Sequence, residues 1–454
     1  MALLAPFRGL RYNLAKITRM EDVVTPPYDV IDLQAQAAFA AKNPYNMIHL
    51  DLSKNFSAAE LTDARYQQAR ETFQRWQEEG VLLREQEPAI YLYHVDYALP
   101  SGGRRTRKGL LSLVRLAEFA EGIVKPHEKT FSGVTSDRLR LLDTCHAQFS
   151  PIFSLYPDAE GTVMTLLEAA CPAEPLCSVV DHDGCLHKLW AVSEPAVLAE
   201  VAALFKEKPL YIADGHHRYT TALQFRALMR ERQGEVAADS PYNHTMMYLC
   251  GMEDPGLSVL PTHRLVHLPG RTGAEALAAT LARSFRLEEI TGGSREFLVG
   301  EVLGRMAEKA GAATTFGLYH PGEDRCFLLT LQDGVMDREF AGAHPASLRE
   351  LDVVVLSDLI LERLLALSHG KCEKEGLVEY YSDVDEALDA SVKESERGAE
   401  RTPVLFLMNS TLVSQVRRVA DEGLVMPHKS TYFYPKALTG LLLNKIVPEE
   451  KVRS

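Results

Sequence analysis

The sequence predicts an α/β (α+β) fold, and three patterns support this prediction. Residues 89–99 alternate like a strand, and residues 109–116 form its return strand after a polar hairpin loop. Residues 60–79 have the apolar spacing of an amphipathic helix, which Gly80 ends. Residues 209–213 form a short apolar strand that leads through a tight polar turn into a helix over 218–232, the usual architecture of an anion site.

The length of 454 residues corresponds to about three domains, or to two with insertions. We expect an N-terminal phosphate-binding domain over 1–235 and a middle α+β domain over 236–345. The middle domain is predicted from strands near 246–252, 316–319 and 326–331 and from helices over 274–285 and 295–310. Residues 346–454 are predicted to form a C-terminal helical segment, with a long helix over 347–368, and a tail that returns to the first domain.

Charge and composition exclude several classes of protein. Lys and Arg number 49 against 62 Asp and Glu, so a general nucleic-acid-binding surface is not expected, although a local basic pocket is compatible with the net charge of −13. The seven cysteines contain no CxxC pair, and we expect free thiols in a reducing cytosol. No signal peptide is recognised, and the most apolar stretch, 351–367, carries too many charges to span a membrane, so we expect a soluble cytoplasmic protein.

The first candidate site is the turn in YIADGHHRYTTA, residues 211–222. Gly215 permits a backbone conformation that other residues resist, and the following helix start offers free N–H groups to an anion. Arg218 can bind phosphate, and His216 or His217 can donate to it. Asp214 can hold Mg²⁺ or accept a proton. The alternative is a capped helix with surface histidines.

The second candidate is the loop in VKPHEKTFSGVTSDRLRLL, residues 124–142. His127 and Glu128 are candidate acid–base groups or metal ligands, and Lys129 is a candidate phosphate ligand. The sequence lacks the second histidine of a zinc-protease helix at this position. A solvated charged loop is the alternative interpretation.

The third candidate is MPHKSTYFYPKALTGLLLN, residues 426–444. Lys429, Ser430 and Thr431 offer a cation and two hydroxyls that can close a phosphate pocket, and Lys436 follows a run of aromatic residues. The alternative is a tail that docks through those aromatic side chains, and both interpretations are compatible with each other.

Two further residues have competing interpretations. Asp29, after a stiff Pro-Pro turn, is predicted to cap the next helix rather than to act as a catalytic carboxylate. His263, between apolar residues in LPTHRLV, is predicted to bond to nearby backbone. The sequence has no P-loop, no dinucleotide-binding GxGxxG after a strand and no GxSxG elbow, so these classes of enzyme are not expected.

Six stretches occur in an order that resembles a known prokaryotic family. They are TPPYDVI, NPYNMIHL, HEKT with SDRLRLL, YIADGHHRYTTAL, LPTHRLV and KSTYFYPKALTGL. Together they resemble domain of unknown function 1015, whose members are sometimes labelled ParB-like, over residues 7–444. The DGHHR turn is also similar to the phosphate-binding box of the ParB and sulfiredoxin superfamily, which includes the free-serine kinases.

The resemblance implies roles for the turn residues. Asp214, Gly215, His217 and Arg218 match the DGxHR-like turn of the free-serine kinases. The ParB box has Glu-Arg-Arg after its glycine, so CTP-gated DNA clamping is not expected here, and sulfiredoxin needs a cysteine where this chain has His216. The kinases also use a carboxylate base near the N-terminus, for which Asp29 and Glu21 are the candidates here, and the family suggests an association with serine biosynthesis.

The function expected from these motifs is phosphoryl transfer or phosphate-ester hydrolysis on a small metabolite, with serine or phosphoserine as the best single candidate. Such transfer depends on positioning and charge neutralisation, which this residue set can supply. Mg²⁺ and a nucleotide, ADP or ATP, are possible cofactors; no nucleic acid or membrane partner is expected. The alternative is a ParB-like regulatory protein that binds a nucleotide without turnover.

Overall fold

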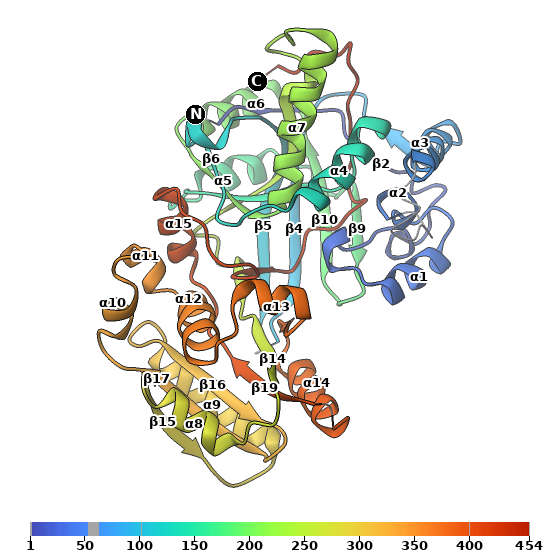
Figure 1. The fold of residues 1–454 in the computed structure, drawn as a ribbon. Helices are drawn as coiled ribbons and strands as arrows, with labels where there is room; N and C mark the ends of the chain where they lie inside the picture. Colours follow the sequence, from blue (N-terminus) through green and yellow to red (C-terminus); the bar gives the residue numbers. More distant parts are fainter. Residues whose placement is uncertain (1, 53–62, 101, 399, 454) are drawn as a thin grey trace. The chain divides into compact units, whose positions relative to one another are not determined.

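A computed structural model describes residues 2–52, 63–100, 102–398 and 400–453 of the chain. It has a mixed α/β architecture, as the sequence predicts, and divides into two compact units. Unit 1 contains Met1–Ser258 together with Pro435–Ser454, and unit 2 contains Val259–Tyr434. The last twenty or so residues therefore return to the N-terminal unit, and each unit is described separately below (Figure 1).

Unit 1 is built on a mixed sheet that has nine strands among the described residues. In order across the sheet these are β6 (Val124–Lys125), β11 (Leu210–Asp214), β8 (Ile152–Tyr156), β12 (His244–Gly251), β5 (Arg104–Arg115), β4 (Ile90–Ala98), β10 (Leu186–Val192) and β9 (Cys177–Val180), with β1 (Leu4–Ala5) paired to β5. Two small ladders join β2 (Leu10–Tyr12) to β3 (Leu82–Arg84) and β7 (Ala147–Gln148) to β21 (Asn444–Lys445).

The helices of unit 1 surround this sheet. They are η1 (Met20–Asp22), η2 (Tyr28–Val30), α1 (Leu33–Lys42), α2 (Ile48–Asp51), α3 (Asp63–Glu78), η4 (Phe119–Glu121), α4 (Ser132–Cys145), α5 (Thr162–Ala169), α6 (Pro195–Phe205), α7 (His216–Gln233) and η5 (Pro241–Asn243). Buried residues of α5, α6 and α7 pack with apolar strand residues into one core, which fixes the start of α7 against the sheet. Helices α4 and α7 lie side by side (Figure 1).

The C-terminal residues 435–446 form a strap across unit 1. The carbonyl of Pro435 accepts a hydrogen bond from the buried Arg107, and the amide of Leu438 donates to the hydroxyl of Tyr93. Further along, the strap forms isolated bridges with the N-terminal region and ends in β21. The strap is thus held at several points along its length, which fixes the side chain of Lys436 between them.

Unit 2 contains a six-stranded sheet in the part of the chain that the structure describes. Its strands, in order, are β15 (Phe285–Ile290), β17 (Arg325–Leu331), β16 (Thr315–His320), β19 (Arg401–Leu407), β14 (His263–Pro269) and β18 (Val378–Tyr381); β13 (Ser258–Leu260) pairs with β20 (Tyr432–Tyr434). The helices are α8 (Ala274–Leu281), α9 (Arg295–Lys309), α10 (Val335–Phe340), α11 (Ala346–Arg349), α12 (Asp352–Val354), η6 (Val355–Leu364), α13 (His369–Glu375), α14 (Val384–Glu396) and α15 (Val413–Asp421).

The predicted domain boundaries fall inside these units. Residues 246–252, assigned from the sequence to a middle domain, belong to β12, which lies between β8 and β5 in the sheet of unit 1. Residues 404–409, assigned to the C-terminal segment, overlap β19 in the sheet of unit 2. Chain order alone does not show that a later strand inserts between earlier ones, so a linear division misplaced both strands.

Several predicted elements also have different limits. The return strand β5 begins at Arg104 rather than at 109, because residues 104–108 pair with β4 as well. The predicted helix over 347–368 is broken into α11, α12 and η6, the last a π-helical segment. Residues 60–62 of the predicted helix 60–79 lie outside the described residues, and α3 covers 63–78.

The state of the cysteines and the polarity of the helices can also be compared with the sequence predictions. Every cysteine is a free thiol, as expected from the spacing. Within the described ranges, each helix is too short or too polar to cross a lipid bilayer.

Candidate functional site

The candidate site lies where β11 turns into α7. Apolar residues 210–213 are buried in the sheet between β6 and β8, and Gly215 is the N-cap of the 18-residue helix α7. Gly215 has φ +92°, and a Cβ atom there would lie 2.8 Å from Nε of Arg218. Glycine is therefore needed both for the backbone conformation and for the space that Arg218 occupies. No side chain of the described residues caps this helix start.

Asp214, at the end of β11, binds two cations. Its Oδ2 accepts from the guanidinium of Arg218, and its Oδ1 accepts from Nζ of Lys436 at 2.5 Å. Arg218 also donates to the carbonyl of Pro151. All three charged side chains are largely buried, and their charges sum to +1. The turn therefore carries a net positive charge at the N-terminal end of a helix dipole.

These contacts redefine the role of Asp214. Burial alone would raise its pKa, but Lys436 and Arg218 lower the pKa well below its usual value. Asp214 thus stays ionised at neutral pH and is a poor general base. Because both of its oxygens already bind cations, a Mg²⁺ ion would have to displace one of them. The residues as arranged do not fit a resident metal at Asp214.

The two histidines of the turn hold the preceding loop. Nε2 of His216 accepts from the amide of His127 at 3.2 Å, and Nε2 of His217 accepts from the amide of Phe131 at 3.0 Å. The ring of His217 also stacks on Phe131, with ring centroids 5.8 Å apart. The first turn of α7 therefore fixes residues 127–131 through two neutral imidazole nitrogens.

The second predicted cluster does meet the first. His127 packs edge-on against His216 with centroids 4.6 Å apart, and Oε2 of Glu128 lies 3.9 Å from Nδ1 of His216. Burial lowers the pKa of His127 to about 4 and that of His216 well below its ordinary value. Both imidazoles are therefore uncharged near pH 7 and positioned to support the loop, and the acid–base role of His127, Glu128 and His216 stays a prediction. Lys129 is exposed on the same loop.

The third predicted cluster belongs to the other unit. Ser430 is buried and its hydroxyl donates to the carbonyl of Pro427 at 2.5 Å, while the carbonyl of Lys429 accepts from Arg264 at 2.9 Å. These residues and Thr431 lie in unit 2, whereas Asp214 and Arg218 lie in unit 1. Their role as phosphate ligands stays a prediction.

Asp29 does not cap the next helix, contrary to the prediction. The N-cap of α1 is Asp32, whose carboxylate accepts from the amide of Ala35 at 2.7 Å. Asp29 is exposed on η2. Burial disfavours the charged form of Arg218, but the carboxylates of Asp214 and Asp29 raise its pKa. Asp29 is therefore close enough to act electrostatically on Arg218, and its carboxylate is not used to cap α1.

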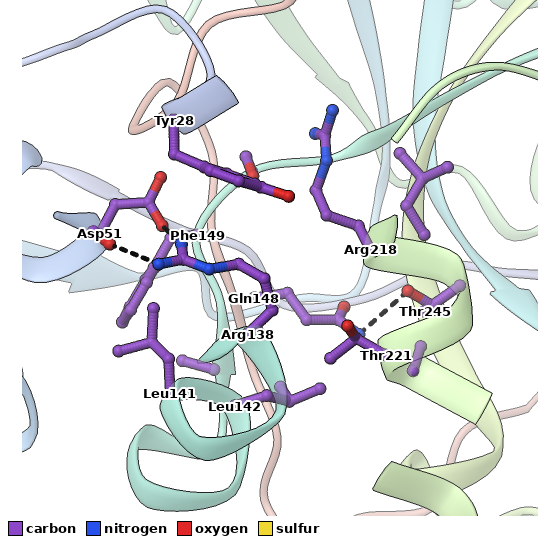
Figure 2. A pocket seen from close by; sticks show the side chains of 14 residues that line it. Tyr28, Asp51, Arg138, Leu141, Leu142, Gln148, Phe149, Arg218, Thr221 and Thr245 are labelled. Atoms are coloured by element: carbon purple, nitrogen blue, oxygen red, sulfur yellow. Dashed lines mark hydrogen bonds and ion pairs between the residues drawn. The ribbon is translucent and has the colours of Figure 1, made fainter. Parts of the chain in front are cut away.

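A pocket opens beside Arg218 (Figure 2). It has a volume of about 60 Å³ and is bounded by Tyr28 from η2, Asp51 from α2, Arg138 from α4 and Arg218 and Thr221 from α7. Tyr28, Asp51 and Arg138 are not among the site residues predicted from the sequence. All three lie within or next to the stretches that carry the family resemblance. Their position in those stretches is the sequence feature that could have identified them.

A buried ionic network fixes the far side of this pocket. NH1 of Arg138 lies 2.7 Å from Oδ1 of Asp51, and the guanidinium of Arg138 lies 4.3 Å from the ring centre of Tyr28. Arg138 also binds Asp137, which in turn pairs with Arg65 of α3 at 3.0 Å. The N-terminal helices are thereby tied to α4, and the pocket wall is held in a defined position.

Among the described residues, one group of three potential metal ligands lies close enough together to hold an ion. It consists of Asp181, His182 and Asp183, on a turn between β9 and β10. It contains none of the predicted site residues. The site at Asp214 is therefore formed by cations and helix N–H groups rather than by a ligand cluster.

Solved structures similar to this chain include a free serine kinase in complex with AMP, at 12% identity and a TM-score of 0.33, covering 72% of this chain and 86% of that one. A conserved hypothetical protein from Pyrococcus furiosus has 13% identity and a TM-score of 0.31, with 72% and 90% covered. SbnI with a C-terminal truncation, from Staphylococcus aureus, has 12% identity and a TM-score of 0.33, with 72% and 85% covered.

Comparison with curated proteins gives no match. A family model, in contrast, matches most of the chain, including the β11–α7 turn, the 124–131 loop and every residue that lines the pocket. The match covers residues 4–354, and the chain belongs to the family described as protein of unknown function (DUF1015).

Proposed function

We propose that this protein acts on a small phosphorylated metabolite, by phosphoryl transfer or by hydrolysis of a phosphate ester, with serine or phosphoserine as the preferred substrate. The observation that supports this most is the cluster of Asp214, Arg218 and Lys436 beside the pocket. Two buried cations share one carboxylate at a helix start whose N–H groups are not capped by a side chain. A phosphate group complements that arrangement.

The cluster suits the chemistry of phosphoryl transfer. The transition state is loose and its charge is spread over the phosphoryl oxygens, so fixed cations and N–H donors supply much of the catalysis. Asp214 holds Arg218 and Lys436 in place and keeps both charged. The remaining N–H groups of Arg218, beyond those that bind Asp214 and Pro151, are the donors available to a substrate.

Asp29 is the carboxylate that we propose as the general base. It is exposed on η2, next to Tyr28 of the pocket wall, and it acts electrostatically on Arg218. Glu21, the other acidic candidate near the N-terminus, pairs with Arg19 at 3.0 Å instead. A base at Asp29 receives the proton of a substrate hydroxyl or of a water molecule while Arg218 binds the phosphate.

The proposal is tested by a screen of purified protein against phosphoserine, serine with ATP or ADP, and other small phosphoesters, with and without Mg²⁺. Released phosphate and transferred phosphate are measured by ³¹P NMR. We expect turnover by the wild type, and a loss of turnover in Asp29→Asn with an unchanged melting temperature.

The screen also distinguishes the alternative function. Thermal stabilisation by a nucleotide, without release or transfer of phosphate under any condition, would overturn the catalytic proposal in favour of a nucleotide-binding regulatory protein. Unchanged turnover in Asp29→Asn would remove that residue from the mechanism while leaving the phosphate site standing.

A further inference from the structure

The pocket beside Arg218 has polar wall atoms that the phosphate site does not use. Figure 2 shows the ring of Tyr28 between Asp51 and Arg218, with the guanidinium of Arg138 beside Asp51 and with Thr221 on the same helix as Arg218. Apolar side chains form much of the remaining wall: Leu141, Leu142, Phe149, Ile152 and Ala222. A cavity with apolar walls and a few polar atoms is typical of a site for a small organic group.

Two polar atoms of this wall have no hydrogen-bond partner. They are Oδ2 of Asp51 and Oγ1 of Thr221. Asp51 is 4% exposed and Thr221 is 3% exposed, so neither residue is well placed to be satisfied by bulk solvent. Buried polar atoms are nearly always paired, and an unpaired one in a cavity points to a missing ligand or water.

Two neighbouring polar side chains, Arg138 and Gln148, are already paired. Oδ1 of Asp51 binds Arg138, and Arg138 is further balanced by Asp137. The amide of Gln148 donates to the hydroxyl of Thr245 at 3.1 Å. The contacts of Arg138 and Gln148 therefore leave both unpartnered atoms unused, and a carboxylate oxygen such as Oδ2 can only accept a hydrogen bond.

Resting on the proposed function, we infer that this pocket binds the non-phosphorylated end of the substrate through a hydrogen-bond-donating group, a hydroxyl or an amine, that reaches Asp51 or Thr221. The phosphate group lies at Arg218, on the other side of Tyr28. The substrate is then a short phosphomonoester with a polar terminus, and its carbon chain contacts the apolar wall.

The volume supports a short substrate. A water-sized group needs about 10–15 Å³ of such space, so about 60 Å³ accommodates roughly four to six non-hydrogen atoms. A nucleoside is several times larger.

Three phosphomonoesters of nearly equal size test the inference: propyl phosphate, 2-hydroxyethyl phosphate and phosphoethanolamine. They end in a methyl, a hydroxyl and an ammonium group. Binding to the full-length protein is measured by calorimetry at fixed pH and salt. We expect one or both polar esters to bind on the order of ten-fold or more tightly than propyl phosphate, the usual effect of a hydrogen bond to a charged group.

Two variants locate the effect. Asp51→Asn keeps an oxygen for Arg138 but removes the charged acceptor, and Thr221→Val removes the hydroxyl at nearly constant volume. Each is expected to reduce the preference for the polar esters and to leave the affinity for propyl phosphate within about two-fold, since one hydrogen bond is removed and the phosphate contacts remain. Thr220→Val is the matched control, because Thr220 is on the same helix but does not line the pocket.

The outcomes separate this inference from the proposed function. Equal or tighter binding of propyl phosphate, or a preference for polar esters that survives both variants, would overturn the pocket assignment even if the enzyme turns over. Selective binding that depends on Asp51, with no turnover of any ester, would support the pocket and overturn the catalytic proposal. Circular dichroism of each variant identifies any loss of folding.

Discussion

Each unit contains a pair of consecutive histidine and arginine residues, half-buried in unit 1 and buried in unit 2, and the two pairs have different surroundings. In unit 1 the pair is His217 and Arg218, and in unit 2 it is His263 and Arg264. The histidines behave alike: Nε2 of His217 and Nδ1 of His263 each accept a hydrogen bond from a backbone amide, at 3.0 Å and 3.1 Å. The prediction of a backbone-bonded His263 is thus confirmed.

The arginines differ in what balances their charge. Arg264 donates to the carbonyls of Thr262 and Lys429 and lies over the ring of Tyr380. It has no carboxylate partner among the described residues, and burial lowers its pKa to about 10. Arg218, by contrast, is held by Asp214 and borders a pocket. A buried arginine that joins backbone carbonyls is a structural support, whereas one with its carboxylate at a cavity is placed to receive an anion.

The largest difference between the units should appear in acid. Burial lowers the pKa of His127 and of His244 to about 4 and lowers that of His216 well below its usual value, all in unit 1. The unfolded chain takes up these protons near pH 6.5, so stability is complete above pH 6.5 and is lost as the pH falls toward 4. From pH 7 to pH 5, His127 and His244 each cost roughly 2 kcal/mol, and His216 acts in the same direction.

Unit 2 should respond much less. His263 has a pKa lowered to about 4 by burial and loses stability in the same pH range. Burial raises the pKa of Asp352 to about 6, and a carboxyl with a raised pKa gains stability as the pH falls toward 5. The two effects have opposite signs and nearly cancel.

Fluorescence can follow unit 1 alone, because both tryptophans, Trp76 and Trp190, belong to it. Denaturant unfolding at pH 7 and at pH 5 should show a marked loss of stability by tryptophan fluorescence. Hydrogen exchange of peptides from unit 2 should change little over the same range. Acid loss of protection that begins in unit 2 would contradict this account of the buried histidines.

The next largest effect is expected from Arg218→Met. It removes a donor from the proposed phosphate site and should reduce turnover, or affinity for a phosphoester, by about 10²–10³-fold. Folding should be retained, because Asp214 keeps its ion pair with Lys436. Steady-state kinetics and calorimetry measure the loss, and thermal unfolding checks the fold.

Arg264→Met is the matched comparison in unit 2. It leaves the carbonyls of Thr262 and Lys429 without their donor and should cost about 1–3 kcal/mol of stability. Phosphoester affinity measured at a temperature where the variant is folded should equal that of the wild type. If Arg264→Met removed binding and Arg218→Met did not, the assignment of the two arginines would be reversed.

The sequence could predict what depends on neighbours in the chain. The strand, the glycine turn and the helix of residues 210–233 follow from apolar spacing and from Gly215, and they are present nearly as expected. The α/β class follows in the same way. The identity of the second cation at Asp214 could not be predicted in this way, because Lys436 lies 222 residues away in the chain.

Burial was the other property that the sequence did not show. His127 and Glu128 have the residue types of an acid–base pair, but the structure packs His127 against His216 and lowers its pKa. Likewise, Asp51 and Arg138 become a pocket wall only because α2 and α4 meet. The type of a residue indicates which reactions its side chain could take part in. The tertiary contacts determine which of these roles the side chain can still perform.

Lys436→Met tests the contact that the sequence left open. Removal of one of two cations from the site should weaken phosphoester binding about ten-fold, less than the loss of the directional donors of Arg218. The backbone contacts of Pro435 and Leu438 should keep the strap in place. Affinity is measured by calorimetry.

Lys445→Met serves as its control. Lys445 lies on the same strap, but its ammonium group contacts Gln77 rather than a site carboxylate. It should leave phosphoester affinity unchanged. An equal loss in the two variants would mean that the strap's attachment, and not the charge at Asp214, determines binding.

The smallest effect expected is that of Gly215→Ala, compared with Gly161→Ala. Both glycines are N-caps with positive φ, +92° before α7 and +64° before α5, so alanine at either position should cost about 1–2 kcal/mol of stability. A Cβ at 161 meets nothing within 4 Å, whereas a Cβ at 215 displaces the guanidinium of Arg218. Phosphoester affinity should therefore fall several-fold in Gly215→Ala only. If both variants lost stability equally and neither lost affinity, Arg218 would tolerate displacement, and the close fit at Gly215 would serve the fold rather than the ligand.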